Sequence, residues 1–134
     1  MKIPEIERVL IEDFGIIKKA DINFSQGLNI ITGDNSSGKT TVIKYLREVY
    51  SLNTLSLGQK IMFDINNEIN KTCILMDDIL FRLDDQNLIK ILKNLENSKR
   101  QVIATLNNSR LDEIKNKIKA NIINSEDFEL KKER

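Results

Sequence analysis

The segment GDNSSGKT, from Gly33 to Thr40, constrains the fold of this chain more than any other feature. It follows the mostly apolar run Leu28–Thr32, which is typical of a buried strand. It precedes a predicted helix whose inward positions are Val42, Tyr45, Leu46 and Val49. The glycines let the backbone curl with its N–H groups pointing inward, and the helix N-terminus adds partial positive charge. A strand, this loop and a helix therefore predict a phosphate-binding loop.

Each residue of this loop is a candidate nucleotide ligand. The set, with one residue beyond the loop, is Gly33, Asp34, Asn35, Ser36, Ser37, Gly38, Lys39, Thr40 and Thr41. Lys39 is expected to reach the β- and γ-phosphates and is also a catalytic candidate, whereas Thr40 would supply a hydroxyl to magnesium. Thr41 can hydrogen-bond the α-phosphate. The alternative is a chance glycine-rich turn, which the spacing and the flanking elements disfavour.

An acidic residue at the end of a neighbouring apolar strand would complete such a site. The run CILMDD provides Asp77 as the second magnesium ligand, after Thr40, and Asp78 as a catalytic residue that polarises an attacking water. The alternative is that the two aspartates only end a strand and cap a turn.

The rest of the chain predicts an α/β order that begins with strands. Strands are expected at Ile6–Ile11, Ala20–Phe24, Leu28–Thr32, Thr72–Met76 and Gln101–Leu106, with edge strands in NII and FEL near the end. Three further helices are predicted from apolar residues at helical spacing. The first carries Ile61, Met62, Ile65 and Ile69, and the second carries Leu88, Ile91, Leu92 and Leu95, with Asp84 or Asp85 as its N-cap. The third carries Leu111, Ile114 and Ile118 and begins with a Ser109–Asp112 capping box. Together with the loop from Gly33 to Thr40, this order predicts one P-loop NTPase domain over residues 1–134. It would have a mainly parallel sheet with helices on both faces, an N-terminal antiparallel β element and a frayed tail at 130–134.

Composition excludes several classes of protein and site. Lysine plus arginine (21) nearly balance aspartate plus glutamate (20), so the net charge of +1 gives no support to a DNA partner. The chain has no histidine, which excludes histidine metal sites and histidine general bases. A single cysteine, Cys73, fits a reducing compartment, and a cytoplasmic location is expected. No apolar run is long enough to cross a membrane, and glutamates interrupt the N-terminus where a signal peptide would be apolar.

Further motifs give the chain a resemblance to a known family. LSLGQK, Leu55 to Lys60, resembles the Leu-Ser-Gly-Gly-Gln signature motif of ABC-type ATPases. The stretch IEDFGIIKKADINFSQGLNIITGDNSSGKTT resembles the opening of the SMC-like, RecF-like and OLD-like branch of that family. FRLDDQN is similar to its D-loop, with Asp84 at the aspartate position, and QVIATLNN resembles the strand that ends in its switch histidine, here Asn107. The resemblance extends from about Ile6 to Asn108.

The resemblance implies a head-to-tail homodimer that encloses ATP and Mg²⁺. The signature motif of one copy would close over the γ-phosphate held by the other, with Ser56, Gly58 and Gln59 as nucleotide ligands and Asn107 at the switch position. The implied function is an ATP-binding domain that dimerises around Mg-ATP and hydrolyses it slowly, in DNA repair, chromosome handling or defence.

Departures from the family pattern leave alternatives open. Leu57 replaces a glycine of the signature motif, Asp78 replaces a glutamate, and Asn107 cannot carry a proton. The fifteen residues from Thr40 to Thr54 contain no glutamine, so the glutamine loop and the helical or coiled-coil insertion of the family are missing from this miniature form. A non-hydrolysing, nucleotide-gated interaction module is therefore one alternative, and a P-loop kinase or GTPase is another. A second polypeptide could supply the missing elements.

Overall fold

The computed structural model describes residues 6–34, 37–50, 54–55, 73–77, 84–97 and 100–131. Its strands are β1 (Arg8–Phe14), β2 (Ile17–Asn23), β3 (Leu28–Thr32), β4 (Thr54–Leu55), β5 (Cys73–Met76), β6 (Gln101–Leu106), β7 (Asn121–Asn124) and β8 (Glu129–Leu130). Its α-helices are α1 (Lys39–Val49), α3 (Asp85–Asn97) and α4 (Asn108–Ile114), and its short 3-10 helices are η2 (Lys115–Lys117) and η3 (Ser125–Asp127).

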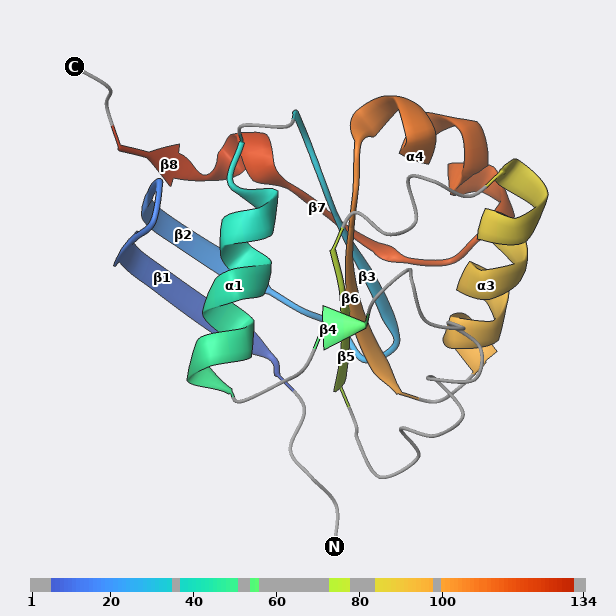
Figure 1. Ribbon diagram of the computed structural model, residues 1–134, viewed down its shortest axis with the longest axis horizontal. Helices are drawn as coiled ribbons and strands as arrows, with labels where there is room; N and C mark the ends of the chain where they lie inside the picture. Colours follow the sequence, from blue (N-terminus) through green and yellow to red (C-terminus); the bar gives the residue numbers. More distant parts are fainter. Residues whose placement is uncertain are drawn as a thin grey trace, which may run out of the picture.

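A five-stranded parallel sheet forms the centre of the fold, in the order β4-β5-β6-β3-β7 (Figure 1). Its central strands, β3 and β6, are mostly apolar because both of their faces are covered, as in the interior of a parallel sheet. Strands β3 and β6 are buried along their whole length. Because β6 lies between β3 and β5, the strand that precedes the glycine-rich loop is not a direct neighbour of the strand that precedes Asp77.

The side chains of the central strands alternate between two hydrophobic clusters. Ile30 of β3 packs with α3 and α4 on one face, whereas the next residue, Ile31, packs with α1 on the other. In β6, Ala104 belongs to the cluster with α3 and α4, and Ile103 belongs to the cluster with α1. Figure 1 shows α1 on one side of the sheet and α3 and α4 on the opposite side. The predicted α/β fold, with a mainly parallel sheet and helices on both faces, is confirmed.

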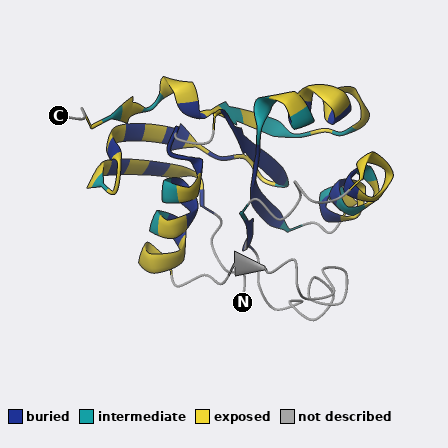
Figure 2. Ribbon diagram, turned by 45° about the horizontal axis from the view of Figure 1, so that its top comes forward, coloured by how far each residue is buried: buried dark blue, intermediate teal, exposed yellow. Residues whose placement is uncertain are grey.

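A three-stranded antiparallel sheet, β1-β2-β8, packs on the α1 side and confirms the predicted N-terminal β element. Buried and exposed residues alternate along β1 and β2, which appears as blue and yellow stripes in Figure 2. The prediction of a frayed tail from residue 130 does not hold for its first two residues. Leu130 pairs with Ile17 in β8, and the Lys131 N–H donates to the Ile16 carbonyl at 2.9 Å.

The other differences from prediction concern element ends and caps. β1 ends three residues later than predicted and β2 begins three residues earlier, because the hairpin pairing continues to Phe14 and Ile17. Val49 is 54% exposed rather than inward, since it lies in the last position of α1, and Ile43 is buried instead. The predicted helix at Ile61, Met62, Ile65 and Ile69 lies outside the described residues.

The caps of the later helices are set by side-chain hydrogen bonds. Asp84 Oδ1 accepts from the Asn87 N–H at 2.8 Å, so Asp84 caps α3. The predicted Ser109–Asp112 capping box is wrong, because Asn107 occupies the N-cap of α4 and accepts from the Arg110 N–H at 2.9 Å. An Asn at this position stops the strand β6 and starts α4 in one step.

Candidate functional site

The glycine-rich loop connects the end of β3 to the start of α1. Its first glycine, Gly33, has a φ of 148°, and its second, Gly38, has a φ of 101° and forms the N-cap of α1. Both values lie in the region that glycine adopts readily and other residues avoid. The Ser37 N–H and hydroxyl both donate to the Asp34 carbonyl, at 3.1 and 2.5 Å, which closes a tight turn within the loop.

Lys39 is the only buried lysine among the residues whose burial the structure describes, with 3% of its surface exposed. Its ammonium group donates to the Gly33 carbonyl at 2.7 Å, across the width of the loop. A buried ammonium is costly unless polar groups surround it. The loop therefore holds a positive charge next to the N-terminus of α1, where backbone N–H groups also favour an anion.

Asp77 and Thr40, the two predicted magnesium ligands, lie together. Asp77 follows β5, and its Oδ1 accepts from the Thr40 hydroxyl at 3.2 Å. Thr105, a fully buried residue of β6, donates to the same oxygen at 2.8 Å. A carboxylate and a hydroxyl are hard oxygen ligands of the kind that Mg²⁺ prefers, and Mg²⁺ commonly takes its remaining ligands from phosphates and water.

Thr105 and Asn108 were not predicted as site residues. The sequence gives only a weak indication that Thr105 belongs to the site: it is the polar residue in the otherwise apolar run VIATL, two positions before Asn107. Asn108 accepts from the Thr32 hydroxyl at 2.7 Å, which connects the end of β3 to the start of α4. These contacts depend on β6 lying between β3 and β5, an arrangement that no local pattern specifies.

Among the other predicted nucleotide ligands, Thr41 and Asn107 lie at the starts of two different helices, α1 and α4. Thr41 is half-buried, and a Cβ at Gly15 would lie 2.8 Å from its Cγ2, so the β1–β2 turn lies against the first turn of α1. The Asn107 Oδ1 accepts from the Arg110 N–H and, at 3.1 Å, from the Ser109 hydroxyl. Six predicted residues lie outside the described residues: Asn35, Ser36, Ser56, Gly58, Gln59 and Asp78.

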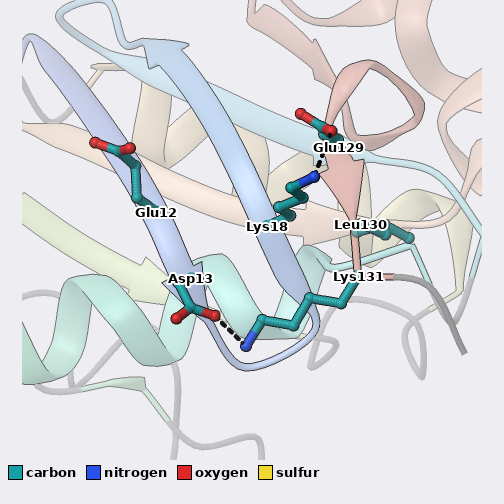
Figure 3. Close-up of a pocket in the computed structure, with 6 residues that line it drawn as sticks. All are labelled: Glu12, Asp13, Lys18, Glu129, Leu130 and Lys131. Atoms are coloured by element: carbon teal, nitrogen blue, oxygen red, sulfur yellow. Dashed lines mark ion pairs between the residues drawn. The ribbon is translucent and has the colours of Figure 1, made fainter.

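A charged hollow lies on the three-stranded sheet (Figure 3). It is lined by Glu12, Asp13, Lys18, Glu129, Leu130 and Lys131. Lys131 Nζ lies 2.6 Å from Asp13 Oδ1, and Lys18 Nζ lies 3.5 Å from Glu129 Oε1. The hydrogen bond from Lys131 lowers the pKa of Asp13. Acidic and basic side chains in this hollow thus pair with each other.

Neither a multi-carboxylate metal site nor a membrane span is found in the part of the chain that the structure describes. Within those residues no three Asp, Glu or Cys side chains gather around a point that could hold a metal ion. In the same residues, no helix has the length and apolar character needed to cross a bilayer.

Comparison with known proteins agrees with this geometry. A family model described as an AAA domain matches residues 8–49, the stretch from β1 to the end of α1 that contains the whole loop. No curated protein matches the chain. The fold and this match together indicate a nucleotide-binding domain of the P-loop ATPase-like class.

Proposed function

We propose that this chain is an ABC-type ATPase domain of the SMC/RecF/OLD-like branch, which binds ATP with Mg²⁺, dimerises around it and hydrolyses it slowly. The observation that carries the proposal is the pair of contacts at the start of α1. Lys39 is buried with its ammonium 2.7 Å from the Gly33 carbonyl, and the next residue, Thr40, lies 3.2 Å from Asp77. A cation and a carboxylate–hydroxyl pair thus flank the same helix N-terminus, as a Mg²⁺–triphosphate needs.

Residues of the loop would bind the triphosphate. The backbone N–H groups from Gly33 to Thr41 and the Lys39 ammonium would hold its oxygens. Lys39 would have to leave the Gly33 carbonyl to do so, which exchanges one polar partner for another. Thr40 and Asp77 would hold the magnesium ion, which supplies neutralising charge on the β- and γ-phosphates when bound.

Hydrolysis would rest on Asp78, which follows Asp77 in the sequence. Its carboxylate would orient a water molecule for attack on the γ-phosphate, with Lys39 balancing the charge that develops. An aspartate is one methylene shorter than the glutamate of the family pattern. Because a misplacement of about 1 Å can cost about a hundredfold in rate, we expect slow turnover.

The dimer would complete each site from a second copy of the chain. Ser56, Gly58 and Gln59 of one copy would close over the nucleotide held by the other, and Asn107 would lie at the same interface as a phosphate ligand. The near-neutral charge of the chain does not favour DNA as a partner, so the cellular role in DNA repair, chromosome handling or defence would depend on a second polypeptide. We expect a cytoplasmic location.

Light scattering after size exclusion, with and without Mg-ATP, tests the proposal. We expect an ATP-dependent change from monomer to dimer in the wild-type chain and in Lys44→Ala, a control on the exposed side of α1. Lys39→Ala and Ser56→Arg should remove it. A longer-lived dimer in Asp78→Asn would identify Asp78 as catalytic.

The two alternatives predict different results. A non-hydrolysing interaction module would dimerise with ATP but would be unaffected by Asp78→Asn. A P-loop kinase or GTPase would bind nucleotide without dimerising, and Ser56→Arg would change nothing. A chain that binds no nucleotide at all would overturn the proposed function.

A further inference from the structure

We infer that Ser125 is a positioning residue of the glycine-rich loop, and that its hydroxyl raises the affinity of the loop for nucleotide. This inference deepens the proposed function and rests on it. Ser125 lies 86 positions after Lys39 and belongs to η3, far from every motif of the sequence.

The sheet register brings Ser125 to the loop. β7 pairs in parallel with β3 at the sheet edge, and Asn124 is the partner of Thr32. The residues that follow these two, Ser125 and Gly33, therefore leave the sheet at the same level and on neighbouring strands. A Cβ at Gly33 would lie 1.8 Å from the Ser125 hydroxyl oxygen, so the serine fills the space that the glycine leaves open.

A chain of hydrogen bonds runs from Ser125 into the loop. The Ser125 hydroxyl contacts the Ser37 hydroxyl, which donates in turn to the Asp34 carbonyl at 2.5 Å. Since the Ser37 proton is committed to Asp34, Ser125 is the donor in the first contact. Both serines are buried, and Ser125 is only 1% exposed. The hydroxyl thus holds Ser37 in the rotamer that closes the loop turn.

Ser125 is itself held in place by its own short helix. Asn124 caps η3 by accepting from the Glu126 N–H at 3.0 Å, and the Phe128 N–H donates to the Ser125 carbonyl at 3.1 Å. The chain then enters β8, where Leu130 pairs with Ile17. The serine is therefore fixed from both sides, by β7 in one sheet and by β8 in the other.

A loop that is already ordered loses less conformational freedom when it binds a ligand. The Ser125 hydroxyl supports the loop through Ser37, which in turn holds the Asp34 carbonyl. Losing the Ser125 hydrogen bond should therefore loosen the loop before nucleotide binds. One hydrogen bond of ordinary strength corresponds to about threefold to tenfold in affinity.

The test compares Ser125→Ala, Ser37→Ala and the double variant. Calorimetric titration with Mg-ATP should give about threefold to tenfold weaker binding for Ser125→Ala. The double variant should bind no more weakly than Ser37→Ala alone, because the two hydroxyls act through one contact. Phe128→Leu is the matched control, since it loosens the packing of the same segment but keeps the hydroxyl. It should lower the melting temperature without a comparable loss of affinity.

A second readout needs no nucleotide. The Ser37 amide donates to the Asp34 carbonyl at 3.1 Å, so its hydrogen exchange reports whether the loop turn is closed. Ser125→Ala should speed exchange at Ser37 about threefold or more, with no change at Val102 of β6. If Ser125→Ala does not fold, Ser125→Cys, whose slightly larger thiol group donates only weakly, should show the same two changes.

Three results would distinguish the role of Ser125 from the proposed nucleotide binding itself. Unchanged affinity and unchanged Ser37 exchange in the serine variants would overturn the inference, and so would an equal loss of affinity in Phe128→Leu. If the wild-type chain binds no ATP but Ser37 exchange rises in Ser125→Ala, the proposed function fails while the positioning of the loop by Ser125 stands.

Discussion

Thr105 donates a 2.8 Å hydrogen bond to the same carboxylate oxygen of Asp77 that accepts the Thr40 hydroxyl at 3.2 Å. The central strand β6 therefore orients the acidic residue at the end of β5 toward the helix that follows β3. Groups that orient a metal-binding carboxylate affect metal affinity even though they do not touch the metal.

Removing the Thr105 hydroxyl should weaken the contribution of magnesium to nucleotide binding. Thr105→Val keeps the shape of the side chain but no longer holds Asp77, so we expect ATP binding in the presence of Mg²⁺ to weaken about tenfold. Binding in the presence of EDTA should not change. Titration of a fluorescent ATP analogue in both conditions measures the difference. Thr105→Ser, which keeps a hydroxyl, should behave like the wild type, and equal losses with and without Mg²⁺ would contradict the assigned role.

Two glycines with positive φ should respond very differently to alanine. Gly27 has a φ of 94° with nothing within 4 Å of an added Cβ, whereas a Cβ at Gly33 would collide with the Ser125 hydroxyl. We expect Gly27→Ala to cost about 1–2 kcal/mol in the free energy of unfolding, from backbone strain alone. Gly33→Ala should cost about 1–3 kcal/mol more, because the collision adds to the strain.

Urea unfolding of both glycine variants without nucleotide measures these costs. Equal destabilisation by the two substitutions would mean that the contact between Gly33 and Ser125 does not form in solution.

Leu92 should be among the most sensitive core positions. It is fully buried in α3 and belongs to the cluster that covers one face of the parallel sheet. Leu92→Ala should lower the free energy of unfolding by about 2–5 kcal/mol, through lost burial and a residual cavity. Lys93→Ala, at the exposed neighbouring position, should change it by no more than about 0.5 kcal/mol. Denaturant titration followed by circular dichroism gives both values, and a small effect at Leu92 would mean that α3 packs elsewhere.

The Asp13–Lys131 ion pair should appear as a lowered carboxyl pKa. The hydrogen bond and the charge of Lys131 favour the ionised form of Asp13 and lower its pKa below the ordinary value of 3.8. The stabilisation is therefore present above pH 3.8 and is lost as the pH falls through the lower, folded-state pKa. In Lys131→Ala the pKa of Asp13 should return toward 3.8, as an NMR titration would show. Lys18→Ala, which removes the partner of Glu129, should leave it unchanged.

The sequence alone determined the elements whose signals are local. The apolar runs at β3 and β6 matched the predicted Leu28–Thr32 and Gln101–Leu106 to the residue, because strands buried on both faces leave a continuous pattern. The loop from Gly33 to Thr40 also has a local signal, since its glycines and its Lys-Thr pair occur at a fixed spacing between a strand and a helix.

The tertiary structure decided which of these elements became neighbours. Strand order placed β6 between β3 and β5 and so brought Thr105 to Asp77, and the parallel register of β7 brought Ser125 to Gly33. Neither contact has a local signal, because the partners are separated by 28 and by 92 residues and meet only after the sheet has formed. The same holds for the C-terminal tail. Its polar composition predicts a frayed end, but Glu129 and Leu130 pair with β2 in the folded chain.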